Sequence, residues 1–502
     1  MPIQRITAPE QDLPLFAIAD TRALEERAGA ALPAHTLMRR AGEAVARLAM
    51  ALAPHAQHVR VLAGPGNNGG DGFEAAMHLR RAGRHVEVVL IGDEARLPAD
   101  AGAALGRARG AGVTIDPRLP AALGAHDIAI DALLGIGARR APEGALAQAV
   151  GSLGALPCPV LAVDLPSGLD ADTGRPLGAA CVRAGHTLAL LTLKPGLFTA
   201  AGRDHAGSVW FDALGVDGSS AAPAAWLAGA AHAVPEVRRH EQHKGSFGDV
   251  AVVAGAAGMT GAALLAARAA AAAGAGRVFV QLLDAASLAL DEERPELMFR
   301  PRWSDSTPDV LGTSTVVCGC GGGETVQAVL PRLLSLVPRL VLDADALNAV
   351  AADGSLQALL RARAARGHAT VLTPHPLEAA RLLGTGAQEV QADRLAAARR
   401  LADAHACVVL LKGSGTVVAA PGRSPWINPT GNAALAGAGT GDVLAGWLGG
   451  LWSQRRRSDA AVGSALAAAW LHGLAADRYG ASVLRATDLI EQMVVRQAAP
   501  AH

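Results

Sequence analysis

The stretch Asn-Pro-Thr-Gly-Asn-Ala-Ala-Leu-Ala-Gly-Ala-Gly-Thr-Gly-Asp spans Asn428–Asp442 and is followed by an apolar helical stretch, Val443–Leu448. Gly437, Gly439 and Gly441 let the backbone approach a ligand closely. The start of the helix that follows offers unpaired amide donors and the positive end of a helix dipole. The stretch therefore predicts an α/β domain with a hole for a phosphate-sized anion at a helix start.

Asp442 lies at the start of this predicted helix, where a carboxylate normally serves only as a cap. Beside an anion hole it could instead accept a hydroxyl proton during phosphoryl transfer. An ordinary pKa near 4 makes it a weak base, but the loose transition state needs positioning more than deprotonation. The sequence has no Gly-x4-Gly-Lys-Ser/Thr match, so the predicted site is not a P-loop.

Other predicted strands of the second half also end in polar or glycine-rich turns. Lys412–Thr416 puts an ammonium group and backbone amides where nucleotide phosphates could lie. Leu342–Asn348 and Thr373–Pro376 follow two further strands, and Gly319–Gly323 makes another tight turn. A lone histidine between prolines is usually a rigid loop residue, so spacing alone leaves the role of His375 open.

A glycine-rich turn also marks the first half. The predicted strand Val59–Ala63 is followed by Gly64–Gly72 (Gly-Pro-Gly-Asn-Asn-Gly-Gly-Asp-Gly), and a helix is predicted from Phe73. Such a turn brings backbone amides and a helix start close to an anion. Its two asparagines and Asp71 are more polar side chains than one helix cap needs, which favours a ligand site.

Two more turns of the first half carry polar clusters, Asp131–Gly137 and Asp164–Gly174. Ligands of open α/β sheets bind beyond the carboxyl ends of the strands, so these turns are expected to meet at one crevice. Oxygen donors from Asn68, Asp131 and Ser167 could hold an alkali or alkaline-earth cation there. Simple turn chemistry is an alternative explanation for the second cluster.

Short apolar runs alternate with helical stretches along most of the chain. This alternation predicts βαβ units in parallel sheets that are covered on both faces, a three-layer α/β fold. The pattern breaks at about 216–235, a segment rich in Gly, Ser, Pro and Ala that is typical of a linker. We therefore expect a domain over 1–215, a linker over 216–235, and a second domain over 236–502. The predicted strands are Val59–Ala63, Val86–Ile91, Ile128–Leu133, Val160–Asp164, Val250–Ala254, Arg277–Leu282, Thr315–Cys318, Leu340–Asp343, Thr370–Thr373 and Cys407–Lys412.

The composition excludes several classes of protein. The 502 residues carry 45 basic and 45 acidic side chains, and aromatic residues make up only 3%. With no net charge and few stacking surfaces, neither nucleic acid nor an anionic membrane is expected as a partner. A hydrophobic fraction of 51% excludes general disorder and favours large cores and small-molecule substrates.

The five cysteines are scattered and lack the spacing of a zinc site. They are expected to be small buried residues of a protein in a reducing compartment. Charged residues at 5, 10 and 12 precede any apolar run, so no signal peptide is expected. These features predict a cytoplasmic protein.

In the order and coverage of its motifs, the chain resembles the bifunctional NAD(P)H-hydrate repair enzymes, in which a hydrate epimerase is fused to an ADP-dependent hydrate dehydratase. In the first half the resemblance is carried by Leu37–Gly42, Gly64–Gly72, Asp131–Gly137, Asp164–Gly174 and Lys194–Leu197. In the second half it is carried by His243–Gly245, Gly258–Ala262, Leu342–Asn348, Thr373–Pro376, Lys412–Thr416 and Asn428–Asp442.

The resemblance implies a Rossmann-like first domain and a ribokinase-like second domain. The first would interconvert the R and S epimers of NADH or NADPH hydrated on the nicotinamide ring. The second would use ADP to phosphorylate the hydroxyl of the S epimer and then eliminate phosphate, giving NADH or NADPH and AMP. The resemblance also implies K⁺ at the epimerase site, Mg²⁺ at the dehydratase site, and a homo-oligomer.

The resemblance further implies two sets of site residues, with Asp442 as the catalytic base of the dehydratase and Asp164 as a proton carrier of the epimerase. The epimerase site would bind the hydrate through Asn67, Asn68, Gly69, Gly70, Asp71, Gly135, Ile136, Gly137, Ala138, Arg139, Arg140, Ala141 and Asp164, and K⁺ through Asn68, Asp131 and Ser167. The dehydratase site would bind the hydrate through Ala262, Gly321, Gly323, His375 and Asp442, and the adenine nucleotide through Lys412, Gly413, Ser414, Gly415, Thr416 and Gly441.

The sequence departs from the family pattern at two places, Arg39 in place of Glu and Leu377 in place of Gly. One alternative is a ribokinase-like kinase that phosphorylates a small alcohol, such as a vitamin precursor, with ATP. The anion-hole motif alone does not separate the two reactions. In a second alternative, the first domain is a nucleotide-binding module without activity, because Rossmann folds are often recruited for binding.

Overall fold

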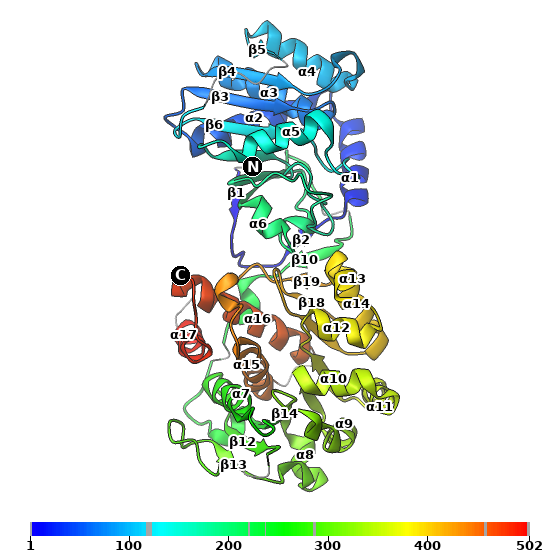
Figure 1. Ribbon diagram of the computed structural model, residues 1–502, viewed down its shortest axis with the longest axis vertical. Helices are drawn as coiled ribbons and strands as arrows, with labels where there is room; N and C mark the ends of the chain where they lie inside the picture. Colours follow the sequence, from blue (N-terminus) through cyan, green and yellow to red (C-terminus); the bar gives the residue numbers. More distant parts are fainter. Residues whose placement is uncertain are drawn as a thin grey trace. The chain divides into compact units, whose positions relative to one another are not determined.

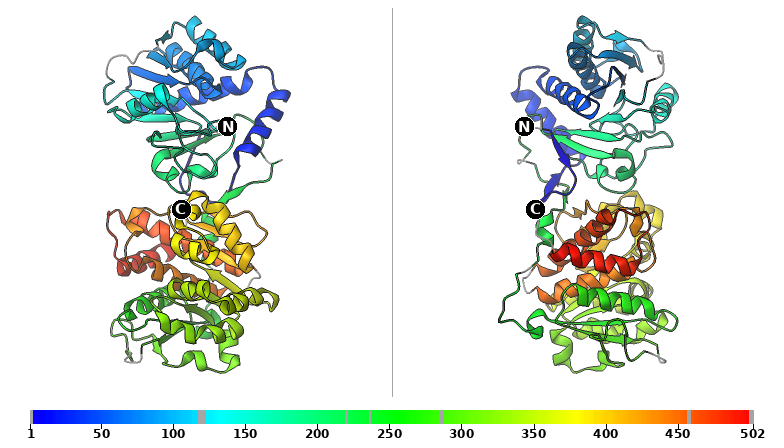
Figure 2. Two further views of the ribbon diagram at one scale, coloured as in Figure 1. Left: turned by 45° about the vertical axis from the view of Figure 1, so that its right-hand side comes forward. Right: turned by 90° about the vertical axis from the view of Figure 1, so that its left-hand side faces the viewer.

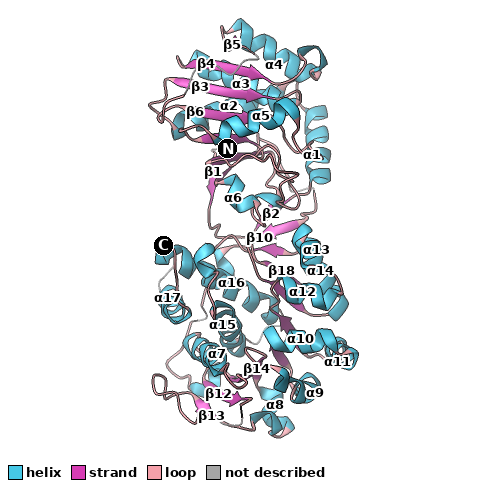
Figure 3. Cartoon of the chain, viewed as in Figure 1, coloured by secondary structure: helices cyan, strands magenta, loops and turns pink. Residues whose placement is uncertain are grey.

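The computed structural model describes residues 3–116, 123–218, 221–235, 237–284, 288–455 and 459–498. Over these residues the chain divides into two compact units (Figure 1). The first comprises Met1–Thr7 and Pro14–Ala225, and the second comprises Ala8–Leu13 and Trp226–His502. In each unit, helices lie on both faces of a central sheet (Figures 2 and 3), which confirms the predicted pair of three-layer α/β folds.

The sheet of the first unit has eight strands in the order β1-β9-β8-β7-β6-β3-β4-β5, and β1 runs antiparallel to β9. Its strands are β1 (Gln4–Ile6), β3 (His58–Ala63), β4 (His85–Leu90), β5 (Thr114–Ile115), β6 (Ile128–Ala132), β7 (Val160–Val163), β8 (His186–Leu190) and β9 (Ser208–Asp212). Its helices are α1 (Ile18–Ala31), α2 (Thr36–Leu52), α3 (Asn67–Arg81), α4 (Ala99–Gly110), α5 (Gly144–Gly154) and α6 (Gly202–Ala206).

The central strands of this sheet are apolar at successive positions because both of their faces are buried. On β3, Val61 and Leu62 point to opposite faces and belong to two separate hydrophobic clusters. On β6, Ile130 and Ala129 divide between the same two clusters. Between β3 and β6 the strand order reverses direction, and this is where open α/β sheets bind their ligands.

Helix α3 begins at Asn67 rather than at Phe73, so the predicted start was wrong by more than one turn. Glycine disfavours helices, but here close packing overrides that preference. A Cβ at Gly69 would lie 2.1 Å from the Gly64 carbonyl oxygen, and one at Gly72 would lie 2.6 Å from the Cβ of Ala132. The glycines therefore allow the first turns of α3 to lie directly on the sheet.

The sheet of the second unit has eleven strands in the order β13-β12-β11-β14-β15-β16-β17-β18-β19-β10-β2, and β18 runs antiparallel to both neighbours. Its strands are β2 (Leu13–Leu15), β10 (Ala225–Leu227), β11 (Asp249–Ala254), β12 (Arg277–Leu282), β13 (Met298–Phe299), β14 (Thr315–Cys318), β15 (Arg339–Leu342), β16 (Ala369–Leu372), β17 (Val408–Leu411), β18 (Val417–Ala419) and β19 (Trp426–Ile427). Its helices are α7 (Thr260–Ala272), α8 (Pro308–Thr313), α9 (Leu330–Leu336), α10 (Ala344–Ala352), α11 (Gly354–Ala365), α12 (Pro376–Leu383), α13 (Ala387–Ala392), α14 (Arg394–His405), α15 (Thr440–Gln454), α16 (Ala460–Tyr479) and α17 (Ala486–Ala498).

Helices α7 and α15 pack against each other at glycines. A Cβ at Gly446 would lie 2.0 Å from the Ala266 carbonyl oxygen, and one at Gly450 would lie 2.4 Å from that of Ala270. Two helix backbones can come this close only where a side chain is missing. The close contact fixes the start of α15, including Asp442, beside the sheet.

The predicted linker over 216–235 is not a continuous coil in the described part, which leaves out residues 219 and 220. Ala225–Leu227 forms β10, and Trp226 and Leu227 pair with Trp426 and Ile427 of β19. Three apolar residues are too few to stand out as a strand in a segment rich in small residues. The first unit therefore extends about ten residues beyond the predicted boundary at 215.

A segment near the N-terminus, Ala8–Leu13, belongs to the second unit. The carboxylate of Asp12 accepts hydrogen bonds from the Gly229 amide at 2.8 Å and from Trp426 Nε1 at 2.8 Å, and it pairs with His232 Nε2 at 2.9 Å. Burial alone would raise the pKa of Asp12. These three contacts stabilise its carboxylate by more than that, so the pKa of the carboxyl is lowered.

None of the helices in the described ranges is both long and apolar enough to cross a membrane.

Candidate active sites

A cavity of the first unit lies at the point where its strand order reverses. It has a volume of about 1010 Å³. Of the residues predicted to bind the hydrate, the structure brings Asn67, Asn68, Asp71, Gly135, Ile136, Gly137, Ala138 and Asp164 to its wall.

The other predicted epimerase residues lie elsewhere. Gly69 and Gly70 pack within the fold, with Gly70 against the thioether of Met38. Arg139 and Arg140 are exposed, and Arg139 lines a separate cavity of about 550 Å³. Ala141 lies near Gly178, where a Cβ would be 2.5 Å from that of Ala141. In the described structure these five residues therefore do not line the larger cavity.

Asp164 lies directly after β7 with a φ of 66°, an uncommon left-handed conformation for a residue other than glycine. Its carboxylate accepts a hydrogen bond from the Leu190 amide at 2.9 Å and forms an ion pair with Lys194. The Lys194 ammonium is completely buried and also donates to the Leu190 carbonyl at 2.8 Å. Asp164 is therefore held rigidly at the cavity wall by a buried charge.

Two further carboxyl groups, Glu25 of α1 and Asp71 of α3, line the same cavity. Partial desolvation at the cavity wall raises the pKa of Glu25, and the negative charge of Asp164 adds to this effect. Burial raises the pKa of Asp71 well above its usual range, with further contributions from the charges of Asp164 and Glu25. Sequence reasoning missed Glu25, which lies outside every motif considered, and it assigned no role to Lys194, although Lys194–Leu197 was among the motifs that carry the resemblance.

Two of the three residues predicted to bind K⁺, the fully buried Asp131 and Ser167, are in contact. Asp131 accepts hydrogen bonds from the Ser167 hydroxyl at 2.6 Å, the Ser167 amide at 2.8 Å and the Leu133 amide at 3.2 Å. All of these donors are neutral, and burial raises the pKa of Asp131 to about 6. The side chain of Asn68 lies beside Gly135 on the cavity wall, and its amide nitrogen is buried without a hydrogen-bond partner in the described structure. A carboxylate of this kind suits a bound cation.

In the second unit, Asp343 joins the ends of three neighbouring strands. It follows β15, and its Oδ1 accepts a hydrogen bond from Thr373, after β16, at 2.7 Å. Lys412, after β17, contacts the same oxygen through Nζ at 2.7 Å. The Lys412 ammonium also lies beside α15, because a Cβ at Gly441 would be 3.5 Å from it.

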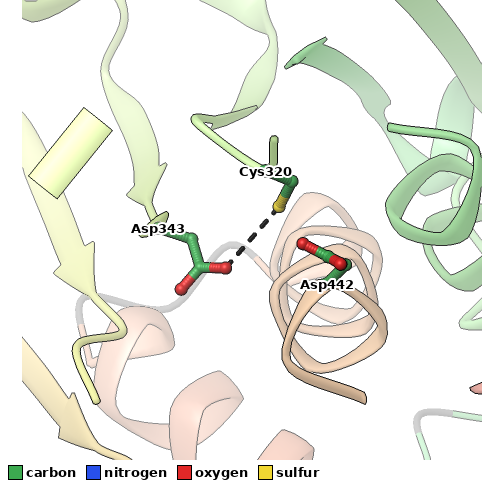
Figure 4. Close-up of side chains that lie close together, drawn as sticks. All are labelled: Cys320, Asp343 and Asp442. Atoms are coloured by element: carbon green, nitrogen blue, oxygen red, sulfur yellow. Dashed lines mark hydrogen bonds between the residues drawn. The ribbon is translucent and has the colours of Figure 1, made fainter. Parts of the chain in front are cut away.

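Asp442 of α15 faces this group across the thiol of Cys320, which follows β14 (Figure 4). Ligand atoms of Cys320, Asp343 and Asp442 all lie within 4.8 Å of one another. Burial raises the pKa of Asp442 to about 6, the charge of Asp343 adds to the rise, and Lys412 opposes it. Burial also keeps Cys320 a neutral thiol, since its pKa lies well above the usual range.

The glycine-rich stretch before α15 is open to solvent, because Ala436, Gly437 and Ala438 are all exposed. Gly439 has a φ of 85°, and the Thr440 hydroxyl donates back to the Gly437 carbonyl at 2.9 Å. The backbone hydrogen bond that closes the first turn of α15 runs from the Val443 amide to the Gly439 carbonyl. The amides of residues 440–442 precede that bond and form the first turn of α15, where an anion can be bound.

The turn Lys412–Thr416 takes its shape from a buried arginine. The guanidinium of Arg394 donates to the carbonyls of Leu411, Lys412 and Gly415 at 3.2–3.4 Å. Gly413 and Ser414 are exposed, whereas Gly415 is buried, and the Thr416 hydroxyl donates to the Gly413 carbonyl. Sequence reasoning missed Arg394, which lies on α14, outside every motif considered.

The remaining predicted dehydratase residues come from three different elements. His375 caps α12, where its Nδ1 accepts hydrogen bonds from the amides of Leu377 and Glu378, and almost half of its side chain is exposed. Gly321 packs against α7, since a Cβ there would lie 3.0 Å from that of Ala262. The amide of Gly323 donates to Asp345 at 2.9 Å.

Fold and geometry together define a two-domain α/β enzyme whose second site has the parts needed for phosphoryl transfer. Two family models match the chain, NAD(P)H-hydrate dehydratase over residues 250–494 and YjeF-related protein N-terminus over residues 34–196. The bifunctional NAD(P)H-hydrate repair enzyme of Escherichia coli is 38% identical over 92% of this chain and 89% of its own length. That of Leishmania infantum is 36% identical over 91% and 88%.

The chain therefore belongs to the family of bifunctional NAD(P)H-hydrate repair enzymes. This confirms the predicted resemblance and favours it over the alcohol-kinase alternative. Among solved structures, an ADP/ATP-dependent NAD(P)H-hydrate dehydratase of Bacillus subtilis, co-crystallised with ATP and Mg²⁺, is 28% identical with a TM-score of 0.43. It covers 53% of this chain and 95% of its own.

Proposed function

We propose that the chain repairs hydrated NADH and NADPH in two reactions, one in each unit. The first unit interconverts the R and S hydrates, and the second converts the S hydrate and ADP into NADH or NADPH, AMP and phosphate. The observation that carries this proposal is the position of Asp442. Its half-buried carboxylate lies in the first turn of α15, next to an exposed glycine-rich turn and close to Lys412.

In the second unit, the phosphoryl group moves from ADP to the hydroxyl of the hydrate. Asp442 accepts the hydroxyl proton, and the amides at the start of α15 hold the phosphoryl oxygens as charge develops on them. Lys412 and the turn that follows it bind the nucleotide phosphates, with Gly441 alongside. The C–O bond of the phosphorylated hydrate then breaks, driven by the lone pair of the ring nitrogen, and phosphate leaves. The ring carbon next to the reacting carbon loses a proton to solvent, which restores the C=C bond of NADH or NADPH.

His375, Ala262, Gly321 and Gly323 form the hydrate-binding side of this proposed site. Support comes from Gly321, which lies next to Cys320 and packs against Ala262. His375 is exposed and anchored by its cap, and its Nε2 lies 3.2 Å from Glu378 Oε1, so a ligand can meet the exposed face of the ring without disturbing α12. Leu377, which stands where the family pattern has glycine, is also exposed. This substitution therefore changes the surface of the protein and not its core.

Mg²⁺ belongs to the proposal as a partner of the nucleotide. Asp343 is already neutralised by Lys412, so phosphate oxygens suit the ion better than this carboxylate does. When bound, Mg²⁺ would reduce the negative charge of the phosphates. Assembly into a homo-oligomer remains a prediction from the resemblance, which sedimentation velocity can test.

K⁺ fits the first unit because the buried Asp131 has only neutral donors around it. Asn68 and Ser167 would supply the other oxygen ligands, and the ion would neutralise Asp131 beside the cavity. Replacing K⁺ by tetramethylammonium should slow epimerisation much more than dehydration. Equal rates of epimerisation in the two salts would contradict the site. Wild-type dehydration in the same two buffers is the control.

The test of the main proposal is incubation of the chain with hydrated NADH and ADP. Recovery of the NADH absorbance together with one AMP per NADH is expected, whereas a stable phosphorylated product would support a kinase instead. Asp442→Asn should lower dehydration by roughly 100-fold or more, since it removes the proton acceptor, and leave epimerisation intact. Full dehydration by this variant would contradict the role of Asp442.

A further inference from the structure

Epimerisation of the hydrate needs two proton-transfer steps. The hydroxyl-bearing carbon adjoins the ring nitrogen, so the hydroxyl can leave as water while the nitrogen lone pair forms an iminium ion. Water can then add to the opposite face of the ring. Loss of the hydroxyl requires an acid, and addition of water requires a base. This inference rests on the epimerase activity proposed for the first unit.

Two of the carboxyl groups that line the cavity of the first unit, Asp71 and Asp164, have opposite electrostatic surroundings. Asp164 forms an ion pair with the buried Lys194, and this contact requires the carboxylate form. Asp71 lines the same cavity from α3, but within the described residues its carboxyl has no hydrogen-bond or ion-pair partner. One group is thus held as an anion, and the other has nothing to stabilise a charge.

The charges around Asp71 strengthen this difference. Glu25 from α1 and Asp164 from the end of β7 are close enough to raise its pKa, and Glu74 on α3 itself acts in the same direction. The positive charge of Lys194 lowers the pKa of Asp71, but this effect is smaller than that of the three carboxylates. A carboxyl that lies beside other carboxylates, without a cationic partner of its own, takes up a proton more readily than an ordinary one and can donate it.

We propose that Asp71 is the general acid and Asp164 the general base of epimerisation. Asp71 gives its proton to the hydroxyl oxygen, the C–O bond breaks, and the electron pair of the ring nitrogen forms the C=N bond. Water then attacks the opposite face, and Asp164 accepts one of its protons as the electron pair returns to nitrogen. Proton exchange through solvent restores both carboxyl groups, so the cycle consumes no other reactant.

The test compares Asp71→Asn with wild type in epimerisation of the purified R hydrate. We expect kcat to fall by roughly 100-fold or more, the usual contribution of a general acid, with KM changed less than about threefold. The variant should melt at the wild-type temperature or above it, because the substitution removes a buried ionisable group. Dehydration of the S hydrate by the same preparation should be unchanged.

The matched control is Asp204→Asn, the same change at an exposed carboxyl on α6 that does not line this cavity. This variant should keep the wild-type kcat. A folded Asp71→Asn variant with kcat within about threefold of wild type would overturn the assignment, as would a loss confined to KM. Failure of the wild-type chain to epimerise would instead refute the proposed function of this unit.

Discussion

At the scale of single residues, Asp343 explains why Lys412 and Asp442 meet. Its carboxylate is fully buried and bridges the ends of β15, β16 and β17 through Thr373 and Lys412. Asp442 therefore faces a carboxylate whose charge Lys412 partly offsets, so the pKa of Asp442 rises only moderately. An aspartate with a pKa of about 6 is a stronger base than an ordinary one and still ionised at neutral pH.

This pKa predicts the pH dependence of dehydration. Protonation removes the acceptor, so kcat/KM should be level above about pH 7 and fall roughly tenfold per pH unit well below about pH 6. Burial and Asp343 set the raised pKa, while Cys320 and Lys412 oppose it. The measurement is a pH profile of dehydration at constant ionic strength. Residual activity of Asp442→Asn should lack this inflection, and a wild-type rate that stays level down to pH 5 would contradict the prediction.

Sequence reasoning at this scale found the residues that lie directly after strands and missed those that arrive from elsewhere. Asp164, Asp442 and Lys412 could be predicted because the carboxyl ends of parallel strands and the helix starts beside them meet at one edge. Glu25 could not, because it comes from α1, before the first central strand. Arg394 could not be predicted either, because it lies on a helix without a recognisable motif. Its link to the site consists of its hydrogen bonds to three carbonyl groups.

At the scale of elements, continuous apolar runs were a dependable guide to the parallel strands. Each of the ten predicted strands lies within one residue of an observed strand. Helix starts were less predictable, since α3 and α15 begin within glycine-rich turns. There the helix is stabilised by tertiary packing that no local propensity contains.

The contact between α7 and α15 gives a prediction at the same scale. Gly446→Ala places a Cβ against the Ala266 carbonyl, so it should lower the free energy of unfolding of the second unit by about 1–3 kcal/mol. The control is Gly354→Ala on α11, where a Cβ meets nothing within 4 Å, and this variant should be neutral or slightly stabilised. Equal melting temperatures for the two variants would contradict the packing described for α15.

At the scale of the whole chain, the two units are not simply consecutive. The chain enters the second unit at Ala8, returns to the first at Pro14, and enters the second again at Trp226. The sequence predicted a single crossing, because a six-residue segment before the first helix has too little pattern to reveal its partner. Its role becomes visible only through Asp12, which contacts residues more than two hundred positions away.

Asp12→Ala should therefore destabilise the second unit, although the substitution lies near the N-terminus. It leaves the indole nitrogen of Trp426 and the Gly229 amide without their acceptor, at a cost of about 1–3 kcal/mol. Differential scanning calorimetry of the full chain should show a lower transition for this unit. Glu10→Ala, an exposed neighbour in the same segment, is the control, and equal effects of the two substitutions would contradict the role of Asp12.

The distance in sequence between Asp12 and Trp426, 414 positions, also bears on how the chain matures during translation. The N-terminal segment leaves the ribosome first, yet its indole partner is among the last parts to be synthesised. The first unit can fold while this short segment still lacks its partners. The second unit cannot complete its folding until nearly the whole polypeptide has emerged. A nascent chain stalled before residue 426 would thus carry a finished epimerase half and an incomplete dehydratase half.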